Sequence, residues 1–559
     1  MKVTPLALKL PEILQQIFEF SDEESNCNSN VLVCRTWSEP CMNVIWREVT
    51  DFHRLLKLLG ETNNYDSGIK FYIREEPLNW NRFSSYARRV QRVCYRATNR
   101  RNSVNSEVFR DIGILRSSSP LLPNLKILEV NGGRFHAPGT MMRNFFIFME
   151  PTLEEYYLRI EDRPDVYTLA HNLRVLADRC PHLTHVQISL PQQYRSFDGT
   201  DELADVLLDF IKKMPNINSI HLSPFRQMIP FTSVLQKNRN LKKLVIGVHE
   251  TAASTPYIES LASTSPTKED YFVSLTTLSV VAPYSIAEEF LTNELCSLNR
   301  ISISSDLRKP ETPSTVEHLL ETLVKKCPRM EALHLSYLSL IDEKHWDLFP
   351  AEGYIQMSHL RPILAHSSMQ SFKLEHPFPV ILEDEFAEEI ASSWPHLRQL
   401  SLVHTPEIRK DLSHGNCFTL RALLSFARHC RNIEYLALLV APESSTCPTS
   451  ADIMLLPAPV FPRLRTLDVG FSVLHECDKA EVAWMLSQIL PEPCLFDVQK
   501  EEIKENKTQR YRNWKEVKRR IPIIRMVKCE MHRLREKDRL KAQVLVVSSS
   551  PGKRPSCDT

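Results

Sequence analysis

Residues 181–190 read PHLTHVQISL, and the same framework returns at residues 328–336 as PRMEALHLS. In both stretches a proline-led turn runs into alternating apolar and polar residues, which is typical of a short strand with one buried face. A helical apolar pattern precedes each stretch and ends at a cysteine, Cys180 or Cys327. One helix, one turn and one strand therefore form a structural unit.

This unit recurs along most of the chain. The copies are PNLKILEV (123–130), PTLEEYYLRI (151–160), PHLTHVQISL (181–190), PNINSIHLS (215–223), NLKKLVIG (240–247), SLTTLSVV (274–281), SLNRISIS (297–304), PRMEALHLS (328–336), the weaker MQSFKL (369–374), PHLRQLSLV (395–403), NIEYLALLV (432–440) and PRLRTLDVG (462–470). A single copy cannot bury its own apolar side, whereas stacked copies share one core. The repeats predict an α/β solenoid with strands lining the inside of a curve and helices outside.

The composition disfavours most cofactor-dependent enzymes. The chain has 559 residues but only 12 glycines, and it lacks the GxGxxG, GxxxxGK[ST] and GxSxG loops that hold phosphates or a nucleophilic serine. Its 14 cysteines form no paired CxxC knuckles, and no HExxH helix is present, so we expect neither a cofactor nor a metal. A doubly wound α/β enzyme remains the rival reading of the alternating strands and helices.

The N-terminal fifty residues differ in character from the repeats. The stretch LPEILQQIF (10–18) predicts a helix with one apolar face, and two further short helices are expected over 31–37 and 38–46, the last begun by Ser38 with Pro40 in its first turn. The polar run NCNSN (26–30) follows the first of these helices and predicts that the second one begins late or packs poorly. So small a helical unit has a marginal core and often completes itself against a partner.

The spacing of LPEILQQIF, of VCRTW (33–37) and of IW (45–46) resembles the F-box. In that family the motif binds the Skp adaptor of SCF-type ubiquitin ligases. Carried over by position, the resemblance implies an adaptor-binding set of Leu10, Pro11, Ile13, Leu14, Ile17, Val33, Cys34, Trp37, Ile45 and Trp46. The alternative is a helical cap for the repeat array that uses the same apolar residues as a private core.

The repeats are similar to the cysteine-containing leucine-rich repeat subtype, although the asparagine that usually follows the strand is mostly absent. F-box and repeats together resemble the substrate-receptor subunits of SCF ligases, with a stretch at 37–49 similar to fungal members. The resemblance implies no catalysis by this chain, a Skp adaptor and through it a cullin as partners, and an unknown protein target marked for degradation. The alternative is a repeat scaffold that binds a protein partner without any ubiquitin connection.

The target is expected on the inner side of the predicted curve, because strand side chains alternate between two faces. The residue between the last two apolar positions of each strand forms a column. Its members include Glu129, Gln187, His221, Ser279, Ser302, His334, Ser401 and Asp468. This column is mixed and weakly charged, which disfavours a nucleic-acid target. The two histidines are four repeats apart, too far to share a metal.

The chain ends in a basic region, since residues 500–541 carry sixteen Lys or Arg against seven Asp or Glu. Trp514, Val517 and Ile521 give a broken helical stripe that predicts a capping helix pair. The predicted organisation is a helical F-box at 1–50, a helical linker and N-terminal cap at 51–120, an irregular leucine-rich-repeat horseshoe at 121–495, a basic helical C-terminal cap at 496–547 and a disordered tail at 548–559. With a net charge of +1 and no long apolar run, we expect no membrane contact and an intracellular location in cytoplasm or nucleus.

Overall fold

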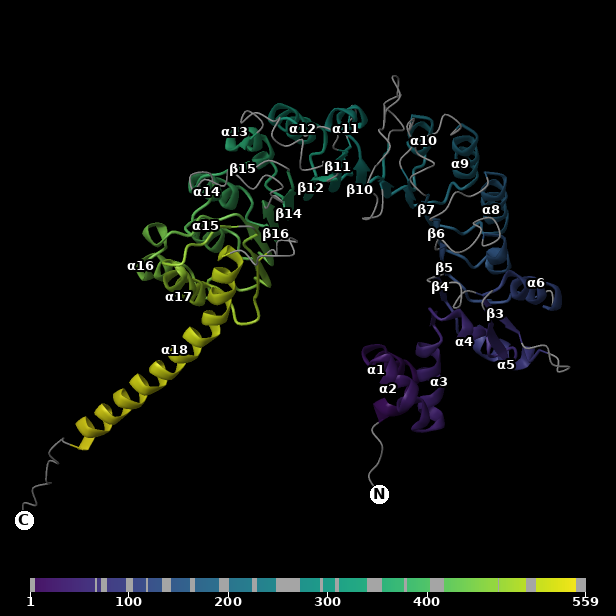
Figure 1. Cartoon of the computed structure of the whole chain (residues 1–559), viewed down its shortest axis with the longest axis horizontal. Helices are drawn as coiled ribbons and strands as arrows, with labels where there is room; N and C mark the ends of the chain where they lie inside the picture. Colours follow the sequence, from purple (N-terminus) through teal and green to yellow (C-terminus); the bar gives the residue numbers. More distant parts are fainter. Residues whose placement is uncertain are drawn as a thin grey trace, which may run out of the picture. The chain divides into compact units, whose positions relative to one another are not determined.

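The computed structural model describes most of the chain, in two compact units, Met1–Asn299 and Arg300–Thr559. The described residues are 6–65, 68–71, 78–96, 104–116, 119–132, 142–160, 166–190, 201–223, 229–247, 272–291, 295–306, 311–338, 354–376, 380–402, 417–470, 472–498 and 509–548. In each unit, helices flank one face of a parallel sheet (Figure 1). We call the opposite face of the strands the open face.

The N-terminal unit begins with a small group of helices and continues as a sheet. Its helices are η1 (Leu6–Lys9), α1 (Pro11–Phe20), α2 (Glu23–Asn28), η2 (Asn30–Leu32), α3 (Arg35–Ile45), α4 (Phe52–Leu56), α5 (Trp80–Ala87), α6 (Ser106–Leu115), η3 (Phe145–Phe148), α8 (Val166–Arg179), α9 (Asp201–Lys213), α10 (Ile229–Leu235) and α11 (Tyr284–Phe290). Its parallel sheet runs in the order β1 (Glu48–Val49), β4 (Arg92–Arg96), β5 (Ile127–Gly132), β6 (Glu155–Ile160), β7 (His185–Ser189), β8 (Ser219–Leu222), β9 (Lys243–Ile246) and β10 (Thr277–Val281). An antiparallel pair, β2 (Thr62–Tyr65) and β3 (Gly68–Phe71), stands apart from it.

The C-terminal unit repeats the same plan. Its helices are α12 (Pro313–Lys326), α13 (Met357–Leu360), η8 (Arg361–Ala365), α14 (Asp384–Ser393), α15 (Ala422–His429), η9 (Ser444–Thr446), α16 (Ser450–Met454), α17 (Lys479–Ile489) and α18 (Gln509–Ser548). Its parallel strands run in the order β11 (Arg300–Asp306), β12 (Ala332–Leu338), β14 (Ser371–Leu374), β16 (Gln399–Leu402), β17 (Tyr435–Leu438), β18 (Thr466–Asp468) and β19 (Leu495–Asp497), and β13 (Ile355–Gln356) pairs with β15 (Val380–Ile381). None of the helices in the described ranges combines the length and apolar character that a membrane crossing requires.

Neighbouring repeats are joined by a regular backbone ladder just before each strand. The carbonyl of Glu154 accepts hydrogen bonds from the N–H groups of Thr184 and His185, at 2.8 and 3.1 Å. In the next repeat the carbonyl of Thr184 accepts from the N–H groups of Asn218 and Ser219. Along the whole of β5, β6 and β7, successive residues alternate between half-exposed and buried. This one-sided burial and the parallel register confirm the predicted α/β repeat solenoid.

The cysteines that close the repeat helices are part of the core. Cys180, Cys327 and Cys430 are fully buried, and the thiol of Cys430 donates to the carbonyl of Trp394 at 3.5 Å. Burial raises the pKa of Cys180 and of Cys430 to about 12, so both stay protonated at neutral pH. Their place in the sequence pattern reflects packing between a helix and the next strand.

The sheet starts earlier than its predicted boundary at residue 121. Within 51–120, expected to be a helical linker and cap, β4 pairs in parallel with β5, and β1 pairs with β4 through Val49 and Val93. Residues 92–96 read RVCYR, which lacks the leucine framework but still alternates enough to bury Val93 and Tyr95. At the other end, α18 is one long helix rather than a helix pair. The predicted tail from residue 549 lies outside the described residues.

The N-terminal helices differ from their predicted bounds. Helix α2 does not begin late: Asp22 caps it at Glu23, because its carboxylate accepts the N–H of Ser25 at 2.7 Å. Helix α3 begins at Arg35 rather than Ser38, so Pro40 lies in its middle. A proline there removes one intrahelical donor and crowds the carbonyl four residues earlier, and the Pro40 side chain is buried.

A buried asparagine explains the polar sequence of α2. The amide of Asn26 is 2% exposed; it donates to the carbonyl of Phe18 at 2.8 Å and accepts from the amide of Asn30 at 2.8 Å. The Phe18 carbonyl belongs to the last turn of α1, where carbonyls lack a helical partner. Asn26 therefore ties α2 to the end of α1 through hydrogen bonds where an apolar residue would only pack.

Replacing Asn26 by alanine is expected to destabilise the N-terminal helices by about 1–3 kcal/mol, because it removes two buried hydrogen bonds, one to the Phe18 carbonyl and one from the Asn30 amide. The Phe18 carbonyl then keeps only the N–H of Ser21, at 3.2 Å. The matched control is Asn28→Ala in the same helix, since Asn28 is exposed. Hydrogen exchange of residues 11–45 in the full chain measures the effect. Equal protection in the two variants would contradict the role given to Asn26.

Candidate protein-binding surfaces

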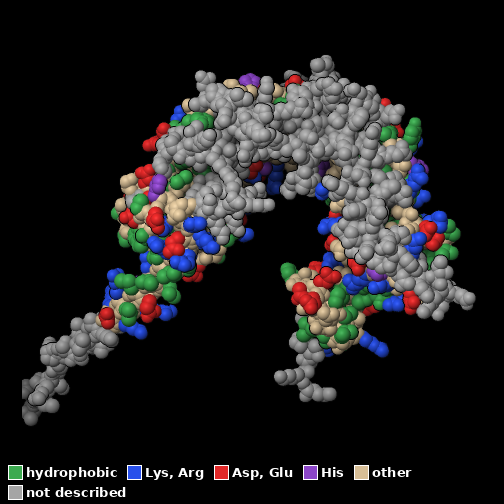
Figure 2. Space-filling model, in the orientation of Figure 1, with side chains coloured by type: hydrophobic (Ala, Val, Ile, Leu, Met, Phe, Trp, Pro, Cys, Tyr) green, Lys and Arg blue, Asp and Glu red, His purple; other side chains and the backbone are tan. Residues whose placement is uncertain are grey.

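Helix α1 presents two apolar faces, and only one of them is buried. Leu14 and Phe18 are 0% and 1% exposed and pack toward α3, where the Phe18 and Trp37 rings lie 5.5 Å apart. A second stripe faces outward. It consists of Leu10, Ile13, Ile17 and Phe20, which are 41%, 36%, 41% and 94% exposed. These positions fall on one side of a helix, so they form a continuous apolar strip, here named the α1 stripe. Hydrophobic side chains reach the surface on these helices in Figure 2.

The structure divides the ten residues of the predicted adaptor-binding set. Leu10, Pro11, Ile13, Ile17, Val33 and Cys34 are exposed. Leu14 is buried, which corrects its assignment to a contact surface, because a side chain inside the helical core cannot reach another protein. Ile45 and Trp46, whose part in the resemblance is to close the group of three helices, are buried as well. Trp37 is half-buried; its indole N–H donates to the Leu8 carbonyl at 3.3 Å.

Two exposed apolar residues beside the predicted set were missed. Phe20 completes the α1 stripe one turn beyond Ile17, and Leu32 is 76% exposed next to Val33, which is 57% exposed. The helical spacing from Ile17 could have identified Phe20. For Leu32 no periodic signal existed, because the short turn η2 ends there.

The helical segment 11–46 contacts the first repeats through residues that lie outside the α1 stripe. Trp46 packs on Tyr86 with ring centroids 4.9 Å apart, and the guanidinium of Arg54 lies 4.5 Å above the Trp46 ring. Arg89 pairs with Glu39 at 2.7 Å and donates to Asn43 of the same helix. These contacts give Trp46 a structural role between the segment and the repeats.

The strand register brings the predicted target-binding column together within each unit. In the N-terminal unit Glu129 and Gln187 both pair with Tyr157, and Gln187 pairs with His221. Val245 then links His221 to Ser279. In the C-terminal unit the column runs through Ser302, His334, Lys373, Ser401, Ala437, Asp468 and Asp497.

Not every column residue is available to a partner. Ser401 and Asp468 are 6% and 7% exposed, so the assignment of these two as contact residues is corrected, whereas the other predicted members are half-exposed. The column also contains Tyr157, Lys373 and Asp497, which the sequence prediction missed. Tyr157 and Lys373 sit at the column position of recognised repeats, so the framework could have identified them, but the strand LFD of Asp497 lacks the leucine pattern.

The column residue Glu129 of the N-terminal unit forms ion pairs with two arginines. The carboxylate of Glu129 accepts from Arg92 at 3.0 Å and from Arg96 at 3.5 Å. Partial burial raises the pKa of Glu129, but the hydrogen bond from Arg92 and its charge outweigh this, so the net pKa is lowered. The charge of Glu129 is therefore neutralised locally, and a partner meets a hydrogen-bonded network there.

A second cluster lies beside the column in the C-terminal unit. Glu375 pairs with the ammonium of Lys373 at 2.6 Å and lies 3.8 Å from the Nε2 of His334. Burial raises the pKa of Glu375, yet His334 and Lys373 together lower it below its usual range. Ser302 neighbours His334 in the column, but in the described part of the chain no hydrogen bond joins the two side chains, so the arrangement resembles a structural ion-pair cluster rather than an acid–base pair.

Asp468 is a buried carboxylate in the column of the C-terminal unit. Its carboxylate accepts the N–H of Gly470 at 2.7 Å, where Gly470 adopts a φ of 52°. Burial raises the pKa of Asp468, and the facing carboxylate of Asp497 raises it further. Because the folded state then binds this proton more tightly than the unfolded chain, Asp468 stabilises the fold below its ordinary pKa of 3.8 and loses that contribution as the pH rises.

Asp468→Asn is therefore expected to raise the melting temperature at pH 8 and to have no such effect near pH 3.5, since the amide oxygen still accepts from Gly470. Melting curves of the full chain between pH 3.5 and 8 test this. Asp497→Asn serves as the control, because Asp497 is exposed and its change is expected to be smaller. A variant less stable than wild type at pH 8 would refute the assignment.

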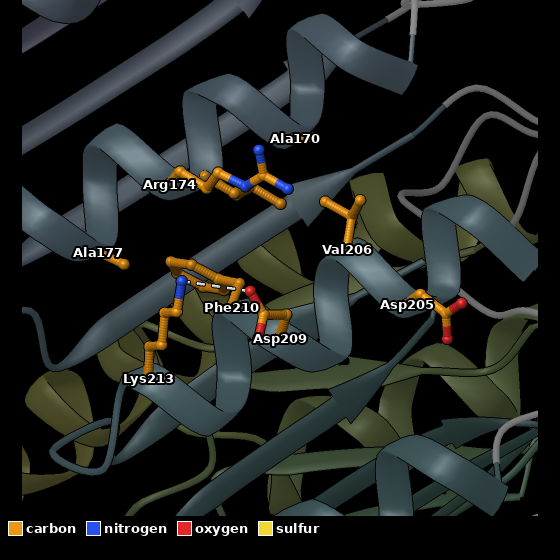
Figure 3. Close-up of a pocket in the computed structure, with 9 residues that line it drawn as sticks. Ala170, Arg174, Ala177, Asp205, Val206, Asp209, Phe210 and Lys213 are labelled. Atoms are coloured by element: carbon orange, nitrogen blue, oxygen red, sulfur yellow. Dashed lines mark ion pairs between the residues drawn. The ribbon is translucent and has the colours of Figure 1, made fainter.

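A cavity of about 240 Å³ lies on the helical side of the N-terminal unit, between α8 and α9. Arg174, Asp205, Asp209 and Lys213 line it with apolar residues, and Lys213 pairs with Asp209 at 3.2 Å (Figure 3). The described residues that line this cavity include no serine, threonine, cysteine or histidine, and the carboxylate of Asp209 is engaged by Lys213. Across the described ranges, no group of three His, Cys, Asp or Glu side chains is close enough to hold a metal ion.

Comparison with known proteins gives only distant similarities. No protein-family model matches the chain, and no curated protein matches it. Solved structures similar to it include the yeast Rad7–Elc1 complex, at 16% identity over 87% of this chain and 92% of that one with a TM-score of 0.35, and the leucine-rich repeat protein LegL7 from Legionella pneumophila, at 11% identity over 53% and 96% with a TM-score of 0.26. Mouse RP105/MD-1 is 12% identical over 74% and 64%, with a TM-score of 0.32. The repeat architecture assigned to this chain rests on its own strand register.

Proposed function

We propose that the chain is a substrate-recognition subunit of an SCF-type ubiquitin ligase. Its N-terminal helices bind a Skp adaptor and through it a cullin, and the open face of the repeats binds a protein that is then ubiquitinated and degraded. The observation that carries the proposal is the α1 stripe. A small helical segment with its core already filled by Leu14 and Phe18 still exposes Ile13 and Ile17, which is the pattern of a docking surface.

The proposed mechanism is proximity, with no chemistry by this chain. The adaptor is held at the N-terminal helices and the target on the strands, so the target lysines meet the recruited conjugating enzyme at raised effective concentration. The contacts of Trp46 and Arg89 support this, because they fix the adaptor-binding helices to the first repeats. Such a subunit works in the cytoplasm, the nucleus or both.

The alternative is a repeat scaffold whose N-terminal helices only cap the sheet. Burial of Ile45 and Trp46 against the first repeats suits a cap equally well. The two functions differ in the α1 stripe, which a cap has no reason to keep apolar and exposed.

Affinity purification of the full chain from cells treated with a proteasome inhibitor tests the proposal. Wild type is expected to recover the Skp adaptor and cullin together with ubiquitinated protein, and the Ile13→Glu/Ile17→Glu variant is expected to lose all three. The point variant is preferable to Leu14→Arg, because a charge at fully buried Leu14 would unfold the helices. Equal adaptor recovery by wild type and the double variant would leave only the scaffold.

A further inference from the structure

Helix α18 consists of a packed inner part and an exposed outer part. Trp514 and Val517 are fully buried, and the guanidinium of Arg525 donates to the Leu490 carbonyl at 2.6 Å. The ammonium of Lys528 lies 5.1 Å over the Trp484 ring of α17. Beyond Lys528, within the described part of the chain, the ion pairs of the helix are internal, as between Arg533 and Glu530.

An exposed apolar strip runs along α18 from the packed inner part into the outer part. Its members are Ile523, Met526, Val527, Met531 and Leu534, which are 51%, 67%, 50%, 49% and 52% exposed. At 100° per residue all five fall on one side of the helix, and we name them the α18 stripe. A helix gains most of its stability in a protein by covering such a side. Hydrophobic and basic side chains are interspersed along this helix in Figure 2.

Basic residues border the α18 stripe on both edges. On the helical projection Arg533 lies beyond one edge with Lys537 just inside it, and Lys528 and Arg535 lie beyond the other edge. Two acidic residues, Glu530 and Asp538, fall within the arc of the stripe. Residues 523–539 hold six Lys or Arg against three Asp or Glu. The surface thus combines an apolar centre with positively charged margins.

We propose that the α18 stripe docks an amphipathic helix of a partner protein whose apolar ridge is bordered by acidic residues. Charge complementarity selects this occupant, because acidic margins on the partner meet the basic edges while the apolar ridge covers the stripe. The two methionines adapt to differently shaped ridges. A second copy of the same helix would bring like charges together at both edges.

Two further features disfavour a lipid surface. Residues 523–539 contain no Trp, Tyr or Phe, the residues that anchor interfacial helices. Glu530 sits within the arc of the stripe, where it would enter the acyl boundary of a bilayer but can pair with a cation of a partner helix. The inference is independent of the adaptor-binding proposal, since it concerns the opposite end of the chain.

Fluorescence anisotropy of the full chain with two labelled helical peptides tests the proposal. Both peptides carry leucines at a and d positions, and their flanking positions are glutamate in one and lysine in the other. The acidic peptide is expected to bind with a Kd of about 10 μM or tighter, at least about tenfold tighter than the basic one. Val527→Glu/Leu534→Glu is expected to weaken the acidic peptide at least about tenfold, and Arg533→Glu/Lys537→Glu to reverse the preference between peptides.

The matched control is Met454→Glu/Leu455→Glu, which alters two exposed apolar residues at the C-terminal end of α16 in the same unit and should leave peptide binding unchanged. Circular dichroism checks that each variant keeps its helix content. Equal binding of the acidic peptide by wild type and the stripe variant overturns the proposal. So does stripe-dependent binding to vesicles of 70% phosphatidylcholine and 30% phosphatidylserine, or stripe-dependent dimerisation, without preference for the acidic peptide.

Discussion

Replacing Ile13 and Ile17 together by glutamate is expected to weaken binding of a Skp adaptor at least about 100-fold without lowering the melting temperature. Both side chains are more than one-third exposed in the free chain, so their replacement removes little from the core. In a complex each would be buried, and full burial of an isoleucine contributes roughly 1.5–3 kcal/mol. Because only about 40% of each side chain is still exposed, the two apolar losses together amount to about 1–2.5 kcal/mol. The two unpaired charges placed in the interface bring the total above the roughly 2.8 kcal/mol of a 100-fold change.

The matched control is Ile114→Glu, which places the same charge on an isoleucine that is 72% exposed on α6, away from the α1 stripe. This variant is expected to bind the adaptor as wild type does. A similar loss in Ile114→Glu and in the double variant would indicate a general effect of added charge. Isothermal titration calorimetry with the full chain separates the two cases.

Trp514→Ala is expected to destabilise the end of the C-terminal unit by about 3–5 kcal/mol, the usual cost of removing a large core side chain. The Trp514 side chain is fully buried, its ring lies 5.7 Å from that of Phe496, and its indole N–H donates to the Ser472 carbonyl at 2.8 Å. Because each repeat contacts only its neighbours, the effect should be local. Hydrogen exchange is expected to show lost protection in α18 and α17 and unchanged protection in the N-terminal unit.

The conservative variant Trp514→Phe keeps most of the ring and loses the hydrogen bond, so it is expected to cost less, about 1–3 kcal/mol. A stability of Trp514→Phe closer to wild type than to Trp514→Ala would show that ring packing contributes more than the hydrogen bond. Full protection of α18 in Trp514→Ala would show that the helix is held by other contacts, and the assigned role of Trp514 would then be wrong.

The repeat architecture was predictable because its signal is periodic. A strand with period two allows only one face to be buried, so Val186 and Ile188 had to point inward and Gln187 outward, as observed. The strand β4 was not predictable in this way, because RVCYR contributes Cys94 and Tyr95 as adjacent buried residues and lacks the leucine framework. Its place in the sheet is imposed by the neighbouring strand β5.

The exposed α1 stripe, the proposed adaptor-binding surface, was predictable only in part, because α1 has apolar residues on two adjacent faces. Periodicity places Ile13 and Ile17 on one side and Leu14 and Phe18 on the other, but it does not say which side α3 will cover. The packing of Phe18 on Trp37 decides this. Likewise, Asn26 looked unsuited to a core position until its two hydrogen bonds were visible, since buried polar groups depend on tertiary partners.

Titration of the purified full chain with a purified Skp adaptor by isothermal calorimetry tests the central claim most directly. The account predicts a 1:1 complex with a Kd below about 1 μM, abolished by Ile13→Glu/Ile17→Glu and unaffected by Ile114→Glu. Negative heat-capacity change on binding is expected from burial of the α1 stripe. Absence of binding by wild type at 50-fold higher concentration, roughly 50 μM, would contradict the account and leave the N-terminal helices as a cap of the repeats.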